Sequence, residues 1–157
     1  DADGQFPIEN LENFREAMAD FPSFAYIGVR SRKQDSVFAR FGSWSSGALC
    51  NLFFRTNYRD FNSACKLING EVLRWLYLEA KGLNYSTDIT GKLIEANFAP
   101  VEVNIRHMTR ISGKSNQSFI RDAVHRFMFV SYIIYRRLLI SIGVLQSPSN
   151  LKNRPYD

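Results

Sequence analysis

The sequence has only two cysteines, Cys50 and Cys65, among its 157 residues. Two thiols are too few for the disulfide framework that stabilises small secreted domains. Neither cysteine belongs to a CxxC pair or has a histidine at metal-ligand spacing, and both are flanked by apolar or small residues. We therefore expect buried free thiols, and this favours an intracellular, reducing compartment or a virion.

Sequence patterns that carry chemistry are also scarce. His107 and His125 lack the HxxxH or HxH spacing that brings two imidazoles to one metal. The serine-rich stretch 42–47 fails the GxSxG spacing of a nucleophile elbow. The GKS tripeptide at 113–115 has Met108 where a P-loop needs its first glycine. The sequence thus predicts no metal, no cofactor and no catalytic residue, and it favours a protein that is not an enzyme.

Long uncharged apolar runs are missing as well. The most apolar stretch covers residues 127–145, but Arg136 and Arg137 interrupt it near its middle. A membrane-spanning helix needs about 18 or more apolar residues, and an arginine at the bilayer centre costs several kcal/mol. The stretch therefore predicts a buried helix rather than a membrane span.

What the sequence does contain is apolar bulk and positive charge. Hydrophobic residues make up 45% of the chain, aromatic residues make up 14%, and thirteen of the aromatics are phenylalanine. This composition suffices for one domain with a hydrophobic core. The formal net charge is +5 and the pI is near 9.4. Such an excess favours an anionic partner, either nucleic acid or a membrane surface.

The longest predicted element is a helix over residues 118–142. On a period of 3.6 residues, its expected inner face is apolar and its expected outer face is basic and partly aromatic. The inner face comprises Ile120, Ala123, Val124, Phe127, Val130, Ile134 and Leu138, and the outer face comprises Arg121, His125, Tyr132 and Arg136.

Shorter elements complete the expected fold. Periodicity predicts helices over 8–18, over 58–81 with an interruption at Gly70, and from Ser86 or Thr87 to Asn97, with a half-buried strand over 101–106. Residues 23–56 predict an antiparallel meander, although 48–55 fits a helix equally well. We expect one α+β domain over 1–157, with a small antiparallel sheet packed on several helices and loose ends at about 1–7 and 147–157. An all-α fold is the alternative.

The basic side chains suggest the function. Arginine offers paired donors to phosphate, and exposed aromatic rings such as Tyr26 offer stacking faces to unpaired bases. We expect a non-enzymatic structural nucleic-acid-binding protein, nucleoprotein or coat-like, that holds the phosphate backbone, prefers RNA to DNA and forms homo-oligomers. The expected contacts are Arg30, Arg32, Lys33, Arg40, Arg55, Arg59, Arg121 and Arg136.

Two other functions compete with this one. The first is an enzyme acting on nucleic acid, such as a metal-dependent nuclease, with Glu95, Glu102 and His107 as catalytic candidates. The second is a homo-oligomeric assembly or adaptor protein whose exposed phenylalanines and tyrosines form the interface. Basic residues spread evenly along a chain also commonly form nothing more than a solvated surface.

Overall fold

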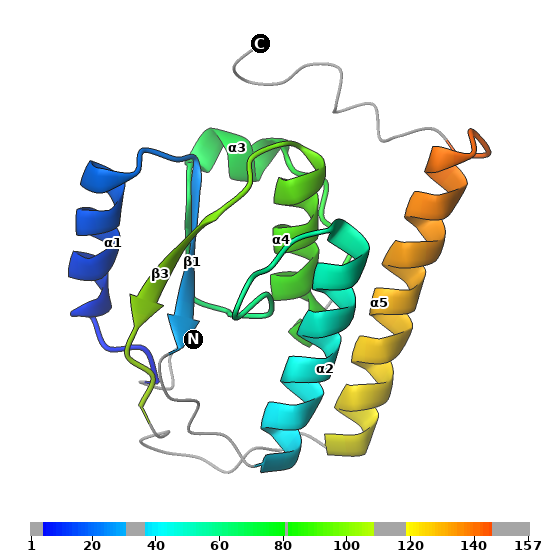
Figure 1. Ribbon diagram of the computed structural model, residues 1–157, viewed down its shortest axis with the longest axis horizontal. Helices are drawn as coiled ribbons and strands as arrows, with labels where there is room; N and C mark the ends of the chain where they lie inside the picture. The colour runs from blue at the N-terminus through cyan, green and yellow to red at the C-terminus, as the bar shows by residue number, and fades with distance from the viewer. Residues whose placement is uncertain (1–4, 31–36, 81, 109–118, 146–157) are drawn as a thin grey trace.

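The computed structural model describes residues 5–30, 37–80, 82–108 and 119–145 (Figure 1). Five α-helices and a three-stranded sheet form the fold within these residues, which confirms the predicted α+β class. In chain order the elements are α1 Asn10–Asp20, β1 Ala25–Arg30, α2 Val37–Phe54, β2 Lys66–Ile68, α3 Gly70–Trp75, the 3-10 turn η1 Gly82–Asn84, α4 Tyr85–Glu95, β3 Val101–Ile105 and α5 Phe119–Ser141.

The sheet is mixed, in the order β2-β1-β3. Strand β1 pairs antiparallel with β2, where Tyr26 faces Leu67, and parallel with β3, where Gly28 faces Val103. A Cβ atom at Gly28 would lie 2.4 Å from the Ile105 side chain, so a residue without a side chain lets the strand pack closely there. The predicted wholly antiparallel sheet is therefore wrong for β3.

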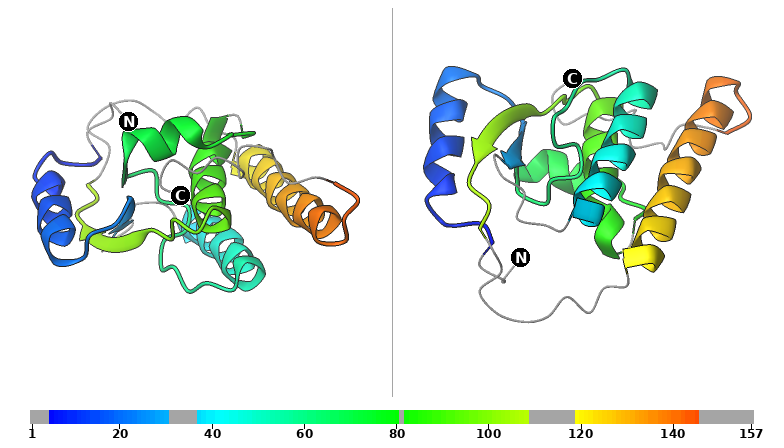
Figure 2. Two further views of the ribbon diagram at one scale, coloured as in Figure 1. Left: turned by 90° about the horizontal axis from the view of Figure 1, so that it is seen from above. Right: turned by 60° about the horizontal axis from the view of Figure 1, so that its bottom comes forward.

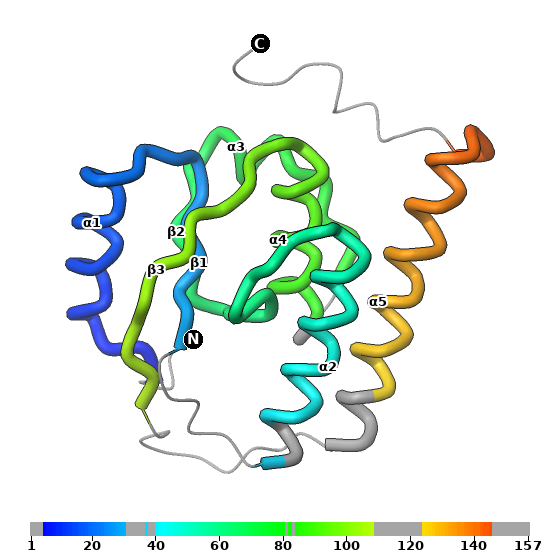
Figure 3. The backbone as a smooth tube through the Cα atoms, in the orientation of Figure 1, coloured from blue at the N-terminus to red at the C-terminus, as the bar shows by residue number. Residues whose placement is uncertain are grey.

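Helices cover both faces of this sheet (Figures 1 and 2). Helix α1 lies on one face, where Phe14 packs with Tyr26, Val103 and Ile105. Helices α3 and α4 lie on the other face, where the buried residues are Ala25, Val72, Ile89 and Leu93. The tube in Figure 3 shows α2 and α5 beyond α4, at the far side of the molecule from α1.

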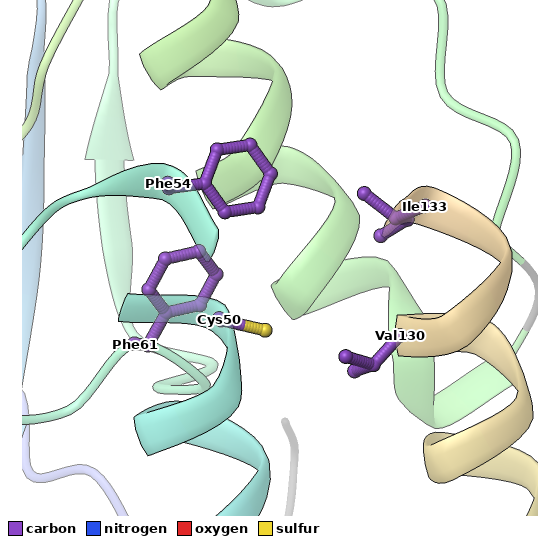
Figure 4. Packing of buried hydrophobic residues seen from close by; sticks show 5 residues of the cluster. All are labelled: Cys50, Phe54, Phe61, Val130 and Ile133. Carbon is purple, nitrogen blue, oxygen red and sulfur yellow. The ribbon is translucent and has the colours of Figure 1, made fainter. Parts of the chain in front are cut away.

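A third cluster of buried residues joins α2 and α5 (Figure 4). Cys50 and Phe54 of α2 face Val130 and Ile133 of α5, and the Phe54 ring stacks on Phe61 with centroids 5.7 Å apart. Burial raises the pKa of the Cys50 thiol to about 12. The expectation of a buried free thiol is confirmed for Cys50, whereas Cys65 is half-buried.

Two of the predicted elements are wrong. Residues 37–54 form α2, so the expected meander is wrong beyond β1, and for 48–55 the helical alternative is the one confirmed. Short apolar runs do not separate strand from helix. The helix expected over 58–81 is replaced by a loop, β2 and α3. The Asn69 side chain accepts hydrogen bonds from the backbone N–H groups of Glu71 and Val72 and so caps α3, which begins at Gly70.

The remaining predicted elements are confirmed. The long helix buries Val130 and exposes His125 and Tyr132 as expected, but the rest of its core-facing side differs from the prediction. Val124, Phe127 and Leu138 were expected inside and are 51%, 63% and 55% exposed, whereas Ile133 and Arg136 are buried. Helix α5 is apolar on most of its circumference, so periodicity alone does not select the inner face. Among the described helices, none combines the length and hydropathy that crossing a membrane requires.

Candidate nucleic-acid interface

A groove of about 360 Å³ separates one face of α2 from the segment 57–61. Helix α2 lines it with Trp44, Gly47 and Asn51 among others, at spacings of three and four residues that bring side chains to a common helix face. The opposite wall includes Tyr58 and Arg59. The groove is large enough for a small organic group such as a nucleobase with its sugar, since ligand pockets start at roughly 300 Å³.

Asn51 fastens the groove walls to each other at one end. Its Nδ2 donates to the Tyr58 carbonyl oxygen at 2.7 Å, and its Oδ1 accepts from the Thr56 hydroxyl at 2.9 Å and from the Tyr58 N–H at 3.0 Å. A single amide thereby holds the segment after α2 against the helix.

Asn62 holds the end of the segment 57–61 against α2 at the other end of the groove. Its Nδ2 donates to the Ser43 carbonyl oxygen at 3.1 Å and to the Ser46 hydroxyl at 2.8 Å, and its Oδ1 accepts from the Thr87 hydroxyl at 2.8 Å. With Asn51 and Asn62 both satisfied, the groove is formed before any ligand enters, and binding requires little reorganisation.

One exposed aromatic ring lines the groove, and a second exposed ring lies beside it. Trp44 lines it and is 65% exposed, and Phe41, also 65% exposed, lies with its ring centroid 5.9 Å from that of Trp44. A large ring left in water costs free energy unless a partner covers it. The flat face of Trp44 can stack on a nucleobase, a sequence-tolerant contact worth roughly 1–3 kcal/mol per base.

One of the predicted arginines lines this groove, and two others lie on or directly after α2. Arg40 lies one helical turn before Trp44, Arg55 follows the last residue of α2, and Arg59 lines the opposite wall. Arg40 and Arg55 are exposed, and no carboxylate of the described residues forms an ion pair with either. Fifteen residues separate the two, so their backbones are about 22 Å apart along the axis of α2.

Arg59 is exposed but already has a partner. Its backbone N–H donates to Glu102 Oε1 at 2.6 Å, and its Nε donates to Glu102 Oε2 at 3.0 Å. The Arg59 side chain is 58% exposed whereas that of Glu102 is 20% exposed, so the guanidinium remains accessible to a phosphate, which would compete with Glu102 for it.

Arg30 is not available for such a contact. Its Nε and Nη2 donate to the two carboxylate oxygens of Asp60 at 2.6 and 2.9 Å, and both side chains are largely buried. Close by, the Lys66 ammonium contacts the Ser63 carbonyl oxygen, and burial lowers the pKa of Lys66 to about 7. Tyr26, expected beside Arg30 on the solvent face, is buried and donates from its hydroxyl to the Phe21 carbonyl oxygen. The prediction of a solvent-facing Arg30 is therefore wrong.

Arg136 is likewise part of the interior. Its Nη1 lies 2.9 Å from Glu79 Oε2, which also receives the Lys92 ammonium at 2.6 Å, while the Tyr132 hydroxyl donates to Glu79 Oε1 at 3.0 Å. Partial burial opposes the ionisation of Glu79, but the hydrogen bond from Lys92 and the charges of Lys92 and Arg136 outweigh it and lower the pKa of Glu79. Arg136 was expected on the outer face of the long helix, and its burial corrects that prediction.

The other expected contacts lie outside the described residues or serve elsewhere. Arg32, Lys33 and the side chain of Arg121 fall in parts of the chain that the structure leaves undescribed. Of the catalytic candidates, Glu102 holds Arg59, and His107 is buried with its ring 5.3 Å from that of Phe6. Within the described residues, no three His, Cys, Asp or Glu side chains are grouped to hold a metal ion.

Sequence reasoning missed Trp44 and Asn51, because it placed residues 23–56 in a meander and so did not bring the two side chains to one helix face. Helical spacing already contains the signal, since Arg40, Trp44, Asn51 and Arg55 recur at intervals of four, seven and four residues. Comparisons with protein-family models, curated proteins and solved structures gave no match, so the functional argument rests on the chain's own groove.

Proposed function

We propose that this protein binds single-stranded nucleic acid in the α2 groove, RNA in preference to DNA, as a non-enzymatic structural protein that also self-associates. The observation that carries the proposal is the exposed Trp44 ring in a preformed groove, with Arg40 one turn away and Arg59 on the opposite wall. Stacking platforms beside cations are the common means of binding unpaired strands without reading their sequence.

The salt dependence of binding tests the electrostatic half of the proposal. Three phosphate contacts, at Arg40, Arg55 and Arg59, predict a slope of log K against log salt of roughly −2 for a single strand. Replacing any one of them with glutamine should reduce the slope by roughly 0.7. The matched control is Arg74→Gln, which removes an exposed arginine of α3 outside the groove and should leave the slope unchanged.

Tryptophan fluorescence tests the stacking half. The chain has two tryptophans, and Trp75 is half-buried with its ring edge-on to Phe98, 6.2 Å between centroids. Oligouridylate should quench the emission of wild type and of Trp75→Phe, but not that of Trp44→Phe. Trp44→Ala should weaken binding roughly 5- to 150-fold, the equivalent of 1–3 kcal/mol for one stacked base. An oligodeoxyribonucleotide of matching length measures the preference for RNA.

Two results would refute the proposal. One is an affinity that Trp44→Ala leaves unchanged, and the other is a slope that Arg74→Gln reduces as much as Arg59→Gln does. A further pair of variants tests whether Glu102 competes with nucleic acid for the Arg59 guanidinium. Glu102→Gln keeps an acceptor for the Arg59 N–H but releases its guanidinium, so affinity should rise more than with Glu16→Gln, an equal charge change on α1.

A further inference from the structure

An exposed stripe, apolar except for Ser131, runs along the outer side of α5, opposite the contacts with α2. Its members recur at alternating intervals of four and three residues over about 27 Å of helix, and each of them is exposed. They are Val124, Met128, Ser131, Tyr135, Leu138 and Ile142, the last still bonded through its N–H to the Leu138 carbonyl oxygen.

This alternation is the spacing of a two-helix seam. A repeat of seven residues with apolar positions four and three apart keeps one line of side chains facing a partner helix. Phe127 and Tyr132 flank the line and are 63% and 45% exposed, which widens the apolar surface. Aromatic residues and methionine are enriched in the cores of protein interfaces, while lysine, glutamate and aspartate are depleted.

From Val124 to Ile142, where the side chains of this helix are described, the arginines point away from the stripe. Arg136 is buried against Glu79, Arg137 lies over the rings of Phe53 and Phe54 at 5.4 and 5.0 Å, and Arg126 is half-buried. A helix that binds a lipid surface instead presents lysines or arginines beside its apolar stripe. Two copies of a chain with net charge +5 repel each other in general, and an uncharged face is where they can approach.

We propose that α5 pairs with α5 of a second copy of this chain along these six residues. The pairing is isologous, so each copy offers the same stripe to the other. It specifies the self-association included in the proposed function and uses no residue of the α2 groove. One helix from each copy gives an interface below about 1,200 Å², at the weak end of the size range, so monomer and dimer should exchange at micromolar concentrations.

Sedimentation velocity across a concentration series of the full chain tests the pairing. The wild-type protein should shift from monomer to dimer as its concentration rises. Met128→Glu and Leu138→Glu should each raise the dissociation constant at least tenfold, because each copy would bury a charged side chain against the apolar stripe of the other. Ile8→Glu is the control, since it places the same charge at an exposed apolar residue outside α5. Circular dichroism and oligouridylate binding verify that each variant is folded.

Three results would overturn the α5 pairing. The first is a wild-type protein that stays monomeric up to several hundred micromolar, and the second is a seam variant that dimerises as wild type does. The third is flotation of monomeric wild type with phosphatidylglycerol vesicles that Met128→Glu abolishes, which would assign the stripe to lipid. Oligouridylate binding reads the α2 groove separately, so failure of the seam leaves the groove proposal standing.

Discussion

Arg55 combines two roles that a substitution can separate. Its φ of 55° places it in the left-handed region, where it ends α2 while the Thr56 N–H donates to the Asn51 carbonyl oxygen at 2.9 Å. Glycine adopts this conformation without steric cost. We predict that Arg55→Gly raises the free energy of unfolding by roughly 1 kcal/mol while it weakens binding of oligouridylate.

The opposite signs of these two effects make Arg55→Gly informative. Urea denaturation measures the first, and fluorescence titration measures the second. Asn97 also has a positive φ, 61°, and follows α4. Asn97→Gly therefore serves as the control that relieves backbone strain without removing a cation, and it should leave binding unchanged. Loss of stability in Arg55→Gly would contradict the strain argument.

Lys66 should make stability depend on pH. Because burial lowers the pKa of Lys66 to about 7, the folded protein has released this proton above pH 7 while the unfolded chain still holds it. Unfolding then takes up a proton, so the free energy of unfolding should rise between pH 7 and 8.5. Lys66→Met should flatten this rise, measured by urea denaturation at each pH. An equal rise in wild type and Lys66→Met would contradict the assignment to Lys66.

At the scale of elements, Gly91 marks the contact between α4 and α2. A Cβ atom at Gly91 would lie 2.9 Å from Cζ of Phe54, whereas one at Gly70 would meet only the flexible end of Arg74 at 3.5 Å. Alanine favours a helix interior over glycine by about 1 kcal/mol. Gly70 is the first residue of α3, so Gly70→Ala should stabilise the protein by less than this. Gly91→Ala should instead lower the free energy of unfolding by roughly 1 kcal/mol, because Phe54 must move.

Thermal and urea denaturation of the two glycine variants compare the same chemical change in two helices. The close approach of the Phe54 ring also explains why residue 91 is glycine. Glycine at this position lowers the helical propensity of α4, but it allows the Phe54 ring to approach the α4 backbone. Stabilisation by Gly91→Ala would show that the ring has room to shift.

The sequence correctly predicted the elements that have a sustained apolar pattern or a recognisable capping residue at one end. Helix α5 is long enough for its apolar period to predict a helix, although not its buried side, β3 alternates apolar and polar residues, and α4 begins near the expected Ser86. The first half of α2 was missed because its aromatic residues also suit a strand, and its second half was left open between strand and helix. The groove depends on Asn51 and Asn62 bonding to partners beyond their own turn of chain, and no local pattern encodes such contacts.

At the scale of the whole molecule, Glu79 holds α5 to the rest of the fold. It joins Lys92 of α4 to Arg136 and Tyr132 of α5. We predict that Glu79→Gln lowers the free energy of unfolding by roughly 2 kcal/mol, less than for a fully buried pair because Glu79 keeps some exposure. The amides of α5 should then exchange hydrogen faster than those of β1.

The Glu79 prediction has a control variant and a second readout, the dependence of stability on pH. Glu12→Gln breaks an exposed ion pair with Arg15 on α1 and should leave α5 unaffected. Because the pKa of Glu79 is lower in the folded protein than in the unfolded chain, its ionised form stabilises the fold at pH values above the unfolded-state pKa. This stabilisation is lost as the pH falls through the folded-state pKa. Acid should therefore release α5 in wild type more than in Glu79→Gln. Equal acid sensitivity of the two proteins would refute a role for Glu79.

The inward placement of Arg136 and Arg137 has a consequence for proteolysis. Two consecutive arginines are an obvious trypsin site in an extended chain, yet here Arg136 is ion-paired with Glu79 and Arg137 lies over aromatic rings. A protease must unwind and detach this helix before its active site can reach either peptide bond. The rate of cleavage after Arg137 therefore measures how often α5 detaches from the rest of the fold and unwinds.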